Sequence, residues 1–443
     1  MNNIILTIFL LVFALISIKN IRYGIYAIIF FMPLYLWRFS IGGIPTTALE
    51  IMIYILFLVW ILNRIRKNLL YKNFYPALAE GFSDFNRLCK NNFILSIGIA
   101  LLFLGLILST VHSSDLRTSL GVCKGWFFDP FLFFIVFISV IKKDKQIILS
   151  LKSWIFSGVA VSLIGIFYLL NNELTFDGRL KAFFLSPNHL AMYLSPAFLI
   201  VLFFLLNKKV FSIQYFCPRR TSLGLAVFSI FLLIIFISLY FTCSYGAFLG
   251  VFIGTLYLFI KNKRLKIKNI YLLGFISFLL LGFIFVSSNK FNQITNSNNR
   301  SSFHSRLMIW NVAGEIIKDS PILGIGPGTF QETYLSYAER FDEPYLEWAV
   351  PQSHNIFLAF YLQTGLIGFV GFIIILIWFF SRRDTINRVS TTVKIYIINA
   401  LMIYILIHGL VDTTYWKNDL SLIFWIVSAL LLINSKNYDI LSE

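Results

Sequence analysis

The sequence predicts an all-α integral membrane protein with about twelve (11–13) transmembrane helices and one long, partly helical external loop. Of its 443 residues, 58% are hydrophobic and only 13% are charged, and the mean hydropathy is +0.81. Apolar runs close to the ~20 residues that cross a bilayer recur along the chain. Lys and Arg gather in short clusters between these runs. This combination excludes an ordinary soluble globular protein.

The apolar runs are bounded by charged residues or by Gly, Pro and Asn. The first two runs are short enough to form one re-entrant hairpin. Residues 1–288 are predicted to hold transmembrane helices 1–10 with short loops, residues 289–354 an external loop, and residues 355–443 the last transmembrane helices and a cytoplasmic tail. The predicted spans are 3–18, 23–37, 47–63, 92–110, 120–141, 147–170, 188–206, 222–243, 246–260, 270–288, 355–380, 394–411 and 420–434.

The loops differ in charge. When alternate loops are assigned to opposite sides, one side receives 26 of the 37 Lys and Arg residues. Short cytoplasmic loops hold the excess of Lys and Arg, so this side is predicted to be the cytoplasm and loop 289–354 is predicted to lie outside. The net charge of +17 therefore indicates topology and not a nucleic-acid-binding face. All five histidines then fall at the outer face: His112, His189, His304, His354 and His408.

The four cysteines lie far apart and form no CxxC pair, which argues against a thiolate metal site or a disulfide framework. Ionisable residues in or near spans are costly in hydrocarbon, and most of them lie toward the outer side. Any chemistry is therefore expected at the outer face. The cysteines are Cys89, Cys123, Cys217 and Cys243. The ionisable residues toward the outer side are Glu50, Lys124, Asp129 and Asp412.

The long outer loop carries a helical pattern. Apolar residues recur at helical spacing over 302–318, which predicts an amphipathic helix lying against the bundle or the lipid interface. A Gly- and Pro-rich turn follows at 321–328, and a second short helix is predicted over 329–340. His354 directly precedes the next span and so is predicted to lie at the membrane surface. The apolar residues are Phe303, Leu307, Trp310, Ala313 and Ile317.

Several motifs in the second half of the chain, from about 178 to 419, resemble the O-antigen ligase and polymerase superfamily. Their order and topology carry the resemblance, since no single motif is specific. The motifs are Arg306-Leu307-Met308-Ile309-Trp310, Pro321 with Gly324-Ile325-Gly326-Pro327-Gly328, Ser353-His354-Asn355 with Leu358, Gly365 and Gly368, the Pro-Asn-x-x-Ala element within Ser186-Pro187-Asn188-His189-Leu190-Ala191, and the His-x-x-x-Asp element His408-Gly409-Leu410-Val411-Asp412.

One motif departs from the family pattern. Members commonly carry Thr-x-Ser-Arg-Gly-Ala at the outer end of a middle span, whereas this chain reads Thr-Cys-Ser-Tyr-Gly-Ala from Thr242. Tyr245 therefore replaces an arginine that would bind the donor. Arg179 or Lys181, in the outer loop before Asn188, could supply the missing charge.

The resemblance implies a GT-C-like fold and a multi-pass enzyme of the cytoplasmic membrane with its active site on the external side. It implies glycan transfer from a polyprenyl-diphosphate-linked donor to a lipid, glycan or protein acceptor, with membrane lipids as further partners and no nucleic acid. A leaving diphosphate gathers negative charge, which guanidinium groups stabilise. The acceptor hydroxyl must lose a proton, a task that suits an imidazole. No cofactor or metal is expected, since no clustered acidic pair of the kind that holds Mg²⁺ is present.

His354 is the predicted base or acceptor-orienting group, and Arg306 the principal diphosphate ligand. Each has a structural alternative: His354 could cap the following helix, and Arg306 could be an interfacial cation that reaches toward water. His189 could merely begin a helix, Asp412 could orient His408 or Lys417, and Lys124 and Asp129 are expected to pack or pair. The further substrate-binding candidates are Arg179, Lys181, Asn188, His189, Tyr245, Arg300, Asn355 and Asp412.

Other function classes stay open. A polytopic transporter or lipid-linked glycan flippase is the main alternative, although the chain has no convincing internal repeat and no charged pair at mid-span. A passive scaffold would not need His, Arg and a Gly- and Pro-rich turn in one outer loop. The sequence does not separate ligase, polymerase and protein oligosaccharyltransferase.

Overall fold

The computed structural model describes residues 2–69, 92–207, 221–261, 302–341, 346–381 and 395–439. Regular structure in these ranges is helical except for one antiparallel hairpin, in which β1 (Arg38–Ile41) pairs with β2 (Ile44–Thr47). Gly42 and Gly43 both have positive φ, at 56° and 80°, as the two-residue turn of such a hairpin requires. The all-α prediction is therefore confirmed, with a small hairpin added in the loop between two predicted spans.

Seven apolar stretches among the described residues have the length and composition to cross a membrane. The predicted spans fall on these stretches or on shorter apolar helices, except for span 270–288, which lies outside the described residues. The long stretches are α3 (Ala48–Leu69), α5 (Phe93–His112), the stretch Leu116–Val140, α8 (Asp144–Leu170), α9 (Pro187–Leu206), α11 (Thr221–Phe241) and α17 (Ile356–Ser381), and the shorter helices are α1 (Asn2–Lys19), α2 (Ile21–Phe30), α12 (Tyr245–Lys261), α18 (Ile395–Gly409) and α19 (Asn418–Asp439).

Two predicted spans are not single α-helices. The prediction of helix over 23–37 is wrong in its second half, because α2 ends at Phe30 and a 3₁₀ segment covers Met32–Leu36. Pro33 lacks the N–H that would continue the α-helix. The stretch Leu116–Val140 is a composite of α6 (Leu116–Val122), a π-helical segment (Cys123–Phe128) and α7 (Asp129–Val140).

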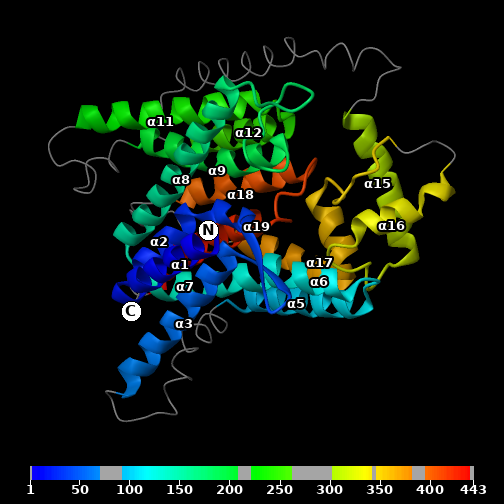
Figure 1. The fold of residues 1–443 in the computed structure, drawn as a ribbon, viewed down its shortest axis with the longest axis horizontal. Helices are drawn as coiled ribbons and strands as arrows, with labels where there is room; N and C mark the ends of the chain where they lie inside the picture. Colours follow the sequence, from blue (N-terminus) through cyan, green and yellow to red (C-terminus); the bar gives the residue numbers. More distant parts are fainter. Residues whose placement is uncertain are drawn as a thin grey trace.

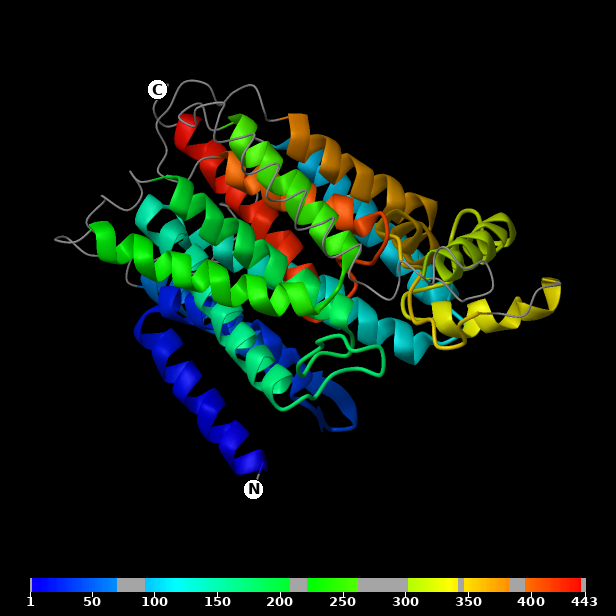
Figure 2. The same ribbon diagram turned by 90° about the horizontal axis from the view of Figure 1, so that it is seen from above.

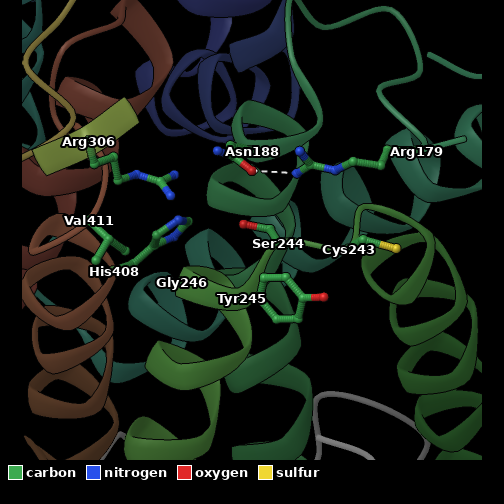
Figure 3. A pocket seen from close by; sticks show the side chains of 9 residues that line it. All are labelled: Arg179, Asn188, Cys243, Ser244, Tyr245, Gly246, Arg306, His408 and Val411. Atoms are coloured by element: carbon green, nitrogen blue, oxygen red, sulfur yellow. Dashed lines mark hydrogen bonds between the residues drawn. The ribbon is translucent and has the colours of Figure 1, made fainter. Parts of the chain in front are cut away.

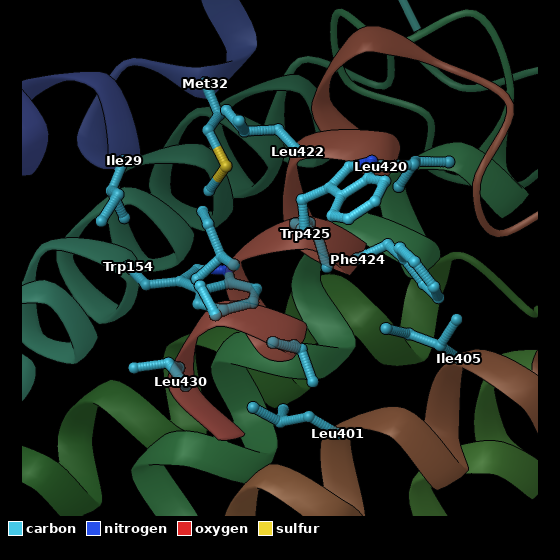
Figure 4. Packing of buried hydrophobic residues seen from close by; sticks show 14 of the residues in the cluster. Ile29, Met32, Trp154, Leu401, Ile405, Leu420, Leu422, Phe424, Trp425 and Leu430 are labelled. Carbon is cyan, nitrogen blue, oxygen red and sulfur yellow. The ribbon is translucent and has the colours of Figure 1, made fainter. Parts of the chain in front are cut away.

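The helix α19 lies in the core of the bundle. Every side chain from Leu420 to Asn434 is buried, as expected of a helix that is apolar on all sides. It packs against α7, α9 and α18. Figure 4 shows its aromatic and aliphatic side chains among those of α8 and α18, with Trp425 and Trp154 close to the centre of the view. The first residues of α19 are thereby held in a fixed place at one end of the bundle.

Glycines bring α5 and α17 into close contact. A Cβ atom at Gly105 would lie 2.1 Å from the backbone nitrogen of Gly368, and one at Gly371 would lie 2.3 Å from that of Leu102. No larger side chain fits at this spacing, so the glycines let the two backbones touch.

The Gly- and Pro-rich turn at 321–328 packs against a break in α17. Gly365 has φ 67° inside the helix, and a Cβ atom there would lie 2.4 Å from the carbonyl oxygen of Ile322. The N–H of Leu366 donates to that oxygen at 2.9 Å, and the N–H of Ile325 donates to the carbonyl of Leu362 at 2.7 Å. The turn is therefore bound to the membrane-spanning bundle.

The described residues of the loop that is predicted to lie outside, 302–341 and 346–354, form a small helical unit at one end of the bundle (Figures 1 and 2). We call it the outer unit after that prediction. The predicted helices are confirmed as α15 (Ser302–Asp319) and as α16 (Phe330–Ser336) with a 3₁₀ turn at Ala338–Arg340. Of the apolar residues that predicted a packing face of α15, Ala313 is buried in the unit, whereas Phe303 is 58% exposed and Leu307 is 37% exposed. The side chains that pack the unit are Ile309, Val312, Ala313, Ile316, Phe330, Tyr334, Tyr337, Val350 and Leu362.

Candidate functional site

A pocket of about 70 Å³ lies where four segments meet at the end of the bundle that carries α15. These segments are the loop before α9 with the first turn of α9, the turn between α11 and α12 with the start of α12, the first turns of α15, and the end of α18 with the residues that follow it. We call it the arginine pocket. Its lining residues are Arg179, Asn188, Cys243, Ser244, Tyr245, Gly246, Arg306, His408 and Val411.

Arg179 lies on one side of the pocket and is held by the neighbouring turn. Its Nε donates to the carbonyl of Thr242 at 2.8 Å and its Nη2 donates to Oδ1 of Asn188 at 2.6 Å. Asp177 lies 3.8 Å from the guanidinium. Burial lowers the pKa of Arg179, Asp177 opposes that effect, and the like charge of Arg306 adds to it. An anion in the pocket would offset both the burial and the repulsion.

Arg306 enters the pocket from α15 on the opposite side. Figure 3 shows both guanidinium groups pointing toward Asn188, with that of Arg306 above the imidazole of His408. Within the described residues, the buried Nε of Arg306 has no hydrogen-bond partner. A buried cationic donor without an acceptor is costly, so this atom is poised to receive one from a ligand.

Asn188 connects the pocket to an acid and a histidine. Its Nδ2 donates to Oδ2 of Asp412 at 2.9 Å, and Oδ1 of Asp412 lies 3.3 Å from Nδ1 of His354. Asp412 also accepts from the backbone N–H of Thr413 at 2.9 Å. Burial raises the pKa of Asp412, but the hydrogen bond from His354 and the charges of His354, His408 and Arg306 outweigh it and hold that pKa well below its usual range.

The Asp412 carboxylate determines what His354 can do. An ionised carboxylate only accepts hydrogen bonds, so the proton of a neutral His354 ring lies on Nδ1 and its Nε2 keeps a free lone pair. The His354 side chain is 28% exposed. This arrangement of acid and imidazole is the one that lets a histidine take a proton from a hydroxyl group.

The backbone around His354 is fixed from both sides. His354 has a φ of 47°, a conformation that few residues other than glycine adopt. Trp310 of α15 donates from Nε1 to the carbonyl of Ser353 at 3.0 Å. Asn355 accepts from the N–H groups of Phe357 and Leu358 as the cap of α17, and its Nδ2 donates to the carbonyl of Leu410 at 3.0 Å. Asn355 therefore ties the start of α17 to the residues that carry Asp412.

The sequence candidates divide by location. Arg179, Asn188, Tyr245 and Arg306 line the pocket, and the contacts above connect His354, Asp412 and Asn355 to it. Lys181 does not line it. His189 does not line it either, because it is buried against Asp419 on another side of α9. Arg300 lies outside the described residues. No three His, Cys, Asp or Glu side chains within the described ranges converge as metal ligands.

His408 is a pocket residue that the sequence did not put among the site candidates. It is fully buried in α18, and its Nδ1 lies 2.8 Å from the hydroxyl of Tyr404. A Cβ atom at Gly246 would lie 2.8 Å from its Cδ2 and 2.6 Å from Val411, so only glycine lets α12 approach this closely. The signal was present, since His408 opens the His-x-x-x-Asp element. Cys243 and Ser244 also line the pocket and were not predicted, although they belong to the same motif as Tyr245.

Comparison with known protein families finds a match in the second half of the chain. Residues 228–373 match the family model described as O-antigen ligase, which confirms the resemblance to the O-antigen ligase and polymerase superfamily. The matched stretch includes Tyr245, Arg306 and His354, while Arg179, Asn188 and Asp412 lie outside it. No curated protein matches the chain. The match, together with the apolar helices, indicates a multi-pass membrane enzyme of the glycosyltransferase or ligase type.

Proposed function

Proceeding from the O-antigen ligase domain at residues 228–373, we propose that this protein transfers a glycan from a polyprenyl-diphosphate carrier to an acceptor hydroxyl. The reaction takes place at the outer face of the cytoplasmic membrane. The single observation that carries the proposal is that the guanidinium groups of Arg179 and Arg306 face one pocket. The buried Nε–H of Arg306 has no acceptor within the described residues. The orientation rests on the excess of Lys and Arg in the loops at the other end of the spans.

The diphosphate of the donor lies between Arg179 and Arg306. Guanidinium groups bind phosphate oxygens with two parallel hydrogen bonds, and they stabilise the charge that builds on the diphosphate as its bond to the sugar breaks. Asn188 keeps Arg179 in place through the 2.6 Å hydrogen bond. Tyr245 lines the same pocket in place of the family's arginine, and Arg179 supplies the positive charge there. No metal ion is needed for this role.

His354 is the general base. Its Nε2 takes the proton of the acceptor hydroxyl, and the oxygen then attacks the anomeric carbon of the donor sugar. The bond between that carbon and the diphosphate oxygen breaks, and the diphosphate leaves with the electron pair. Asp412 keeps the proton of His354 on Nδ1 and stabilises the imidazolium that forms, through the 3.3 Å contact.

Reconstitution in vesicles with a polyprenyl-diphosphate glycan and a hydroxyl acceptor tests the proposal. Arg306→Ala and His354→Ala are each expected to lower the transfer rate by about 10²- to 10⁴-fold. Tyr361→Phe is the matched control, because the Tyr361 hydroxyl donates to the carbonyl of Pro321 on the same outer unit without lining the pocket. Full activity in both alanine variants would refute the assignment of the site. Movement of the carrier across the membrane without any transfer would favour a flippase.

A further inference from the structure

A second polar pair lies behind the arginine pocket, on another side of α9. Nε2 of His189 lies 3.1 and 3.2 Å from the two carboxylate oxygens of Asp419, and the hydroxyl of Tyr35 lies 3.3 Å from the same nitrogen. The side chains of His189 and Asp419 are 2% and 0% exposed. The ring of Phe184 packs against His189 at 4.7 Å between centroids. This pair is therefore closed off from the pocket.

Stability alone does not explain a pair in this position. Removing an acid and an imidazole from water costs free energy that their attraction often fails to recover, and apolar replacements of a buried pair are often neutral or stabilising. A buried pair does, however, fix the register between the elements that carry it. The His189–Asp419 pair therefore fixes α9 relative to the start of α19.

The residue next to His189 in the chain contacts Asp412, the acid beside the proposed base. Asn188 and His189 are consecutive residues of the first turn of α9, so their side chains leave the helix about 100° apart. Asn188 binds Asp412 at 2.9 Å, and His189 binds Asp419 at 3.1 Å. Residues 410–417, which we call the Asp412 segment, join α18 to α19. One turn of α9 therefore holds Asp412 in this segment and also Asp419, the second residue of α19.

The first residues of α19 are anchored on their other side as well. Nδ2 of Asn418 donates to Oε1 of Glu50 at 3.0 Å, and its Oδ1 accepts from Nε1 of Trp126 at 3.1 Å. Asp419 is thus a fixed point, and His189 attaches α9 to it. The Asp412 segment is also held by Asn355, which donates to the carbonyl of Leu410, and by Thr414, which donates to the carbonyl of Ile405. The Asn188 bond and the His189–Asp419 pair hold this region against α9.

We propose that the buried His189–Asp419 pair is a positioning device that fixes the Asp412 segment against α9, so that Asp412 meets His354 in the orientation required for transfer. The proposal rests on the proposed function, because the role of the Asp412–His354 pair does. His189 and Asp419 are positioning residues that contact no substrate. They act on the base through Asp412.

The first experiment replaces both partners, His189→Leu with Asp419→Leu, so that no unpaired charge is left buried. The double variant is expected to fold and to lose about 10- to 100-fold in kcat, with the KM for the donor within about twofold of the wild type. Tyr193→Phe is the matched control, because it removes a buried 2.6 Å hydrogen bond to Ser157 from the same helix and leaves the Asp412 segment untouched. An unchanged kcat in the double leucine variant would overturn the proposal.

A double-mutant cycle separates positioning from general damage. In an Asp412→Ala background the two leucine substitutions are expected to cause no further loss, because the acid that they position is already absent. An equal loss in both backgrounds would overturn the proposal. If the leucine variant does not fold, His189→Gln takes its place in the experiment. The Gln amide nitrogen can still donate to Asp419, so this variant is expected to keep kcat within a few-fold of wild type. A loss as large as that expected of the leucine pair would count against positioning.

Hydrogen exchange of the backbone amides gives a readout that does not depend on transfer. Exchange in residues 410–417 is expected to rise about tenfold or more in the double leucine variant and to stay unchanged in Tyr193→Phe. Unchanged exchange in this segment would refute the positioning role, whatever the enzyme does. A wild-type protein without any transfer would instead refute the proposed function, and the exchange result would still decide whether the pair fixes the segment.

Discussion

Two clusters of charged residues border the Asp412 segment and differ in how their charges are satisfied. In the Glu50 cluster, Lys124 lies 2.8 Å from Glu50 and also donates to the carbonyl of Pro45, while Asn418 binds the other oxygen of Glu50. The arginine pocket instead holds two guanidinium groups and a buried donor without an acceptor. An ion pair whose charges are neutralised by each other is typical of a structural role. A buried cationic donor without an acceptor is typical of a site that binds an anion.

The largest expected effect is on transfer. Asp412→Asn is expected to lower kcat by about 10²- to 10⁴-fold, because a neutral amide no longer holds His354 with its proton on Nδ1. Glu50→Gln makes the same chemical change in the Glu50 cluster and is expected to leave kcat within about twofold. Initial rates in vesicles measure both. Equal losses in the two variants would remove the distinction between the clusters.

The next effect is on anion binding. Arg306→Lys is expected to raise the inhibition constant of inorganic diphosphate about tenfold, because an ammonium group lacks the planar pair of donors. Lys124→Arg is expected to leave that constant unchanged, since Glu50 neutralises the cation at this position. Competition against the lipid-linked donor measures both constants. A larger change at Lys124 than at Arg306 would reverse the assignment.

Thermal stability is expected to suffer more from loss of Lys124 than from loss of Arg306, the reverse of the order expected for anion binding. Lys124→Ala leaves Glu50 buried without its partner, and its cost is expected to be about 1–3 kcal/mol because the lysine is 28% exposed. Arg306→Ala removes an unsatisfied buried donor and is expected to be neutral or stabilising. Thermal unfolding in detergent measures the stability of both variants. Adding Glu50→Gln to Lys124→Ala removes the unpaired charge and is expected to restore part of the lost stability. Greater destabilisation by Arg306→Ala would contradict the comparison.

The smallest effect is expected at an exposed pair on the outer unit. Hydrogen bonds from Tyr337 and Arg340 hold the pKa of Asp319 below its usual value. Its contribution to stability is therefore present above the unfolded pKa of ~3.9 and is lost as the pH falls through the folded value. The difference in Tm between wild type and Asp319→Asn is expected to be small above about pH 4 and to vanish as the pH falls through the folded pKa of Asp319, which lies below that. A large or pH-independent difference would show that this pair is not solvent-screened.

Composition and periodicity were sufficient to predict the helices and the outer unit, because apolar runs and helical spacing are local signals. The break in α17 at Gly365 and the π-helical segment Cys123–Phe128 were not predicted. Both depend on what packs against the helix, such as the carbonyl of Ile322 beside Gly365. The hairpin at 38–47 had a local signal in Gly42-Gly43 that hydropathy alone does not weigh.

The candidate residues were found by motif, but their arrangement was not. Asn188 and Asp412 are 224 positions apart, and no spacing rule predicts their hydrogen bond. His189 shows a second limit, since it adjoins Asn188 in sequence and yet faces α19. The rotation of α9 about its axis decides which of the two residues reaches the pocket, and tertiary packing sets that rotation.

The broken helix α17 has a mechanical consequence. Only Asn355 separates His354 from the first turn of α17. Beside the break at Gly365, the N–H of Leu366 donates to the turn that comes after α15, the helix that carries Arg306. Any tilt of the part of α17 before this break would move His354 and Arg306 in the same direction. In the proposed mechanism, one helix would therefore set the distance between the proton acceptor and the phosphate ligand, and thickening or thinning of the surrounding bilayer would move the two together.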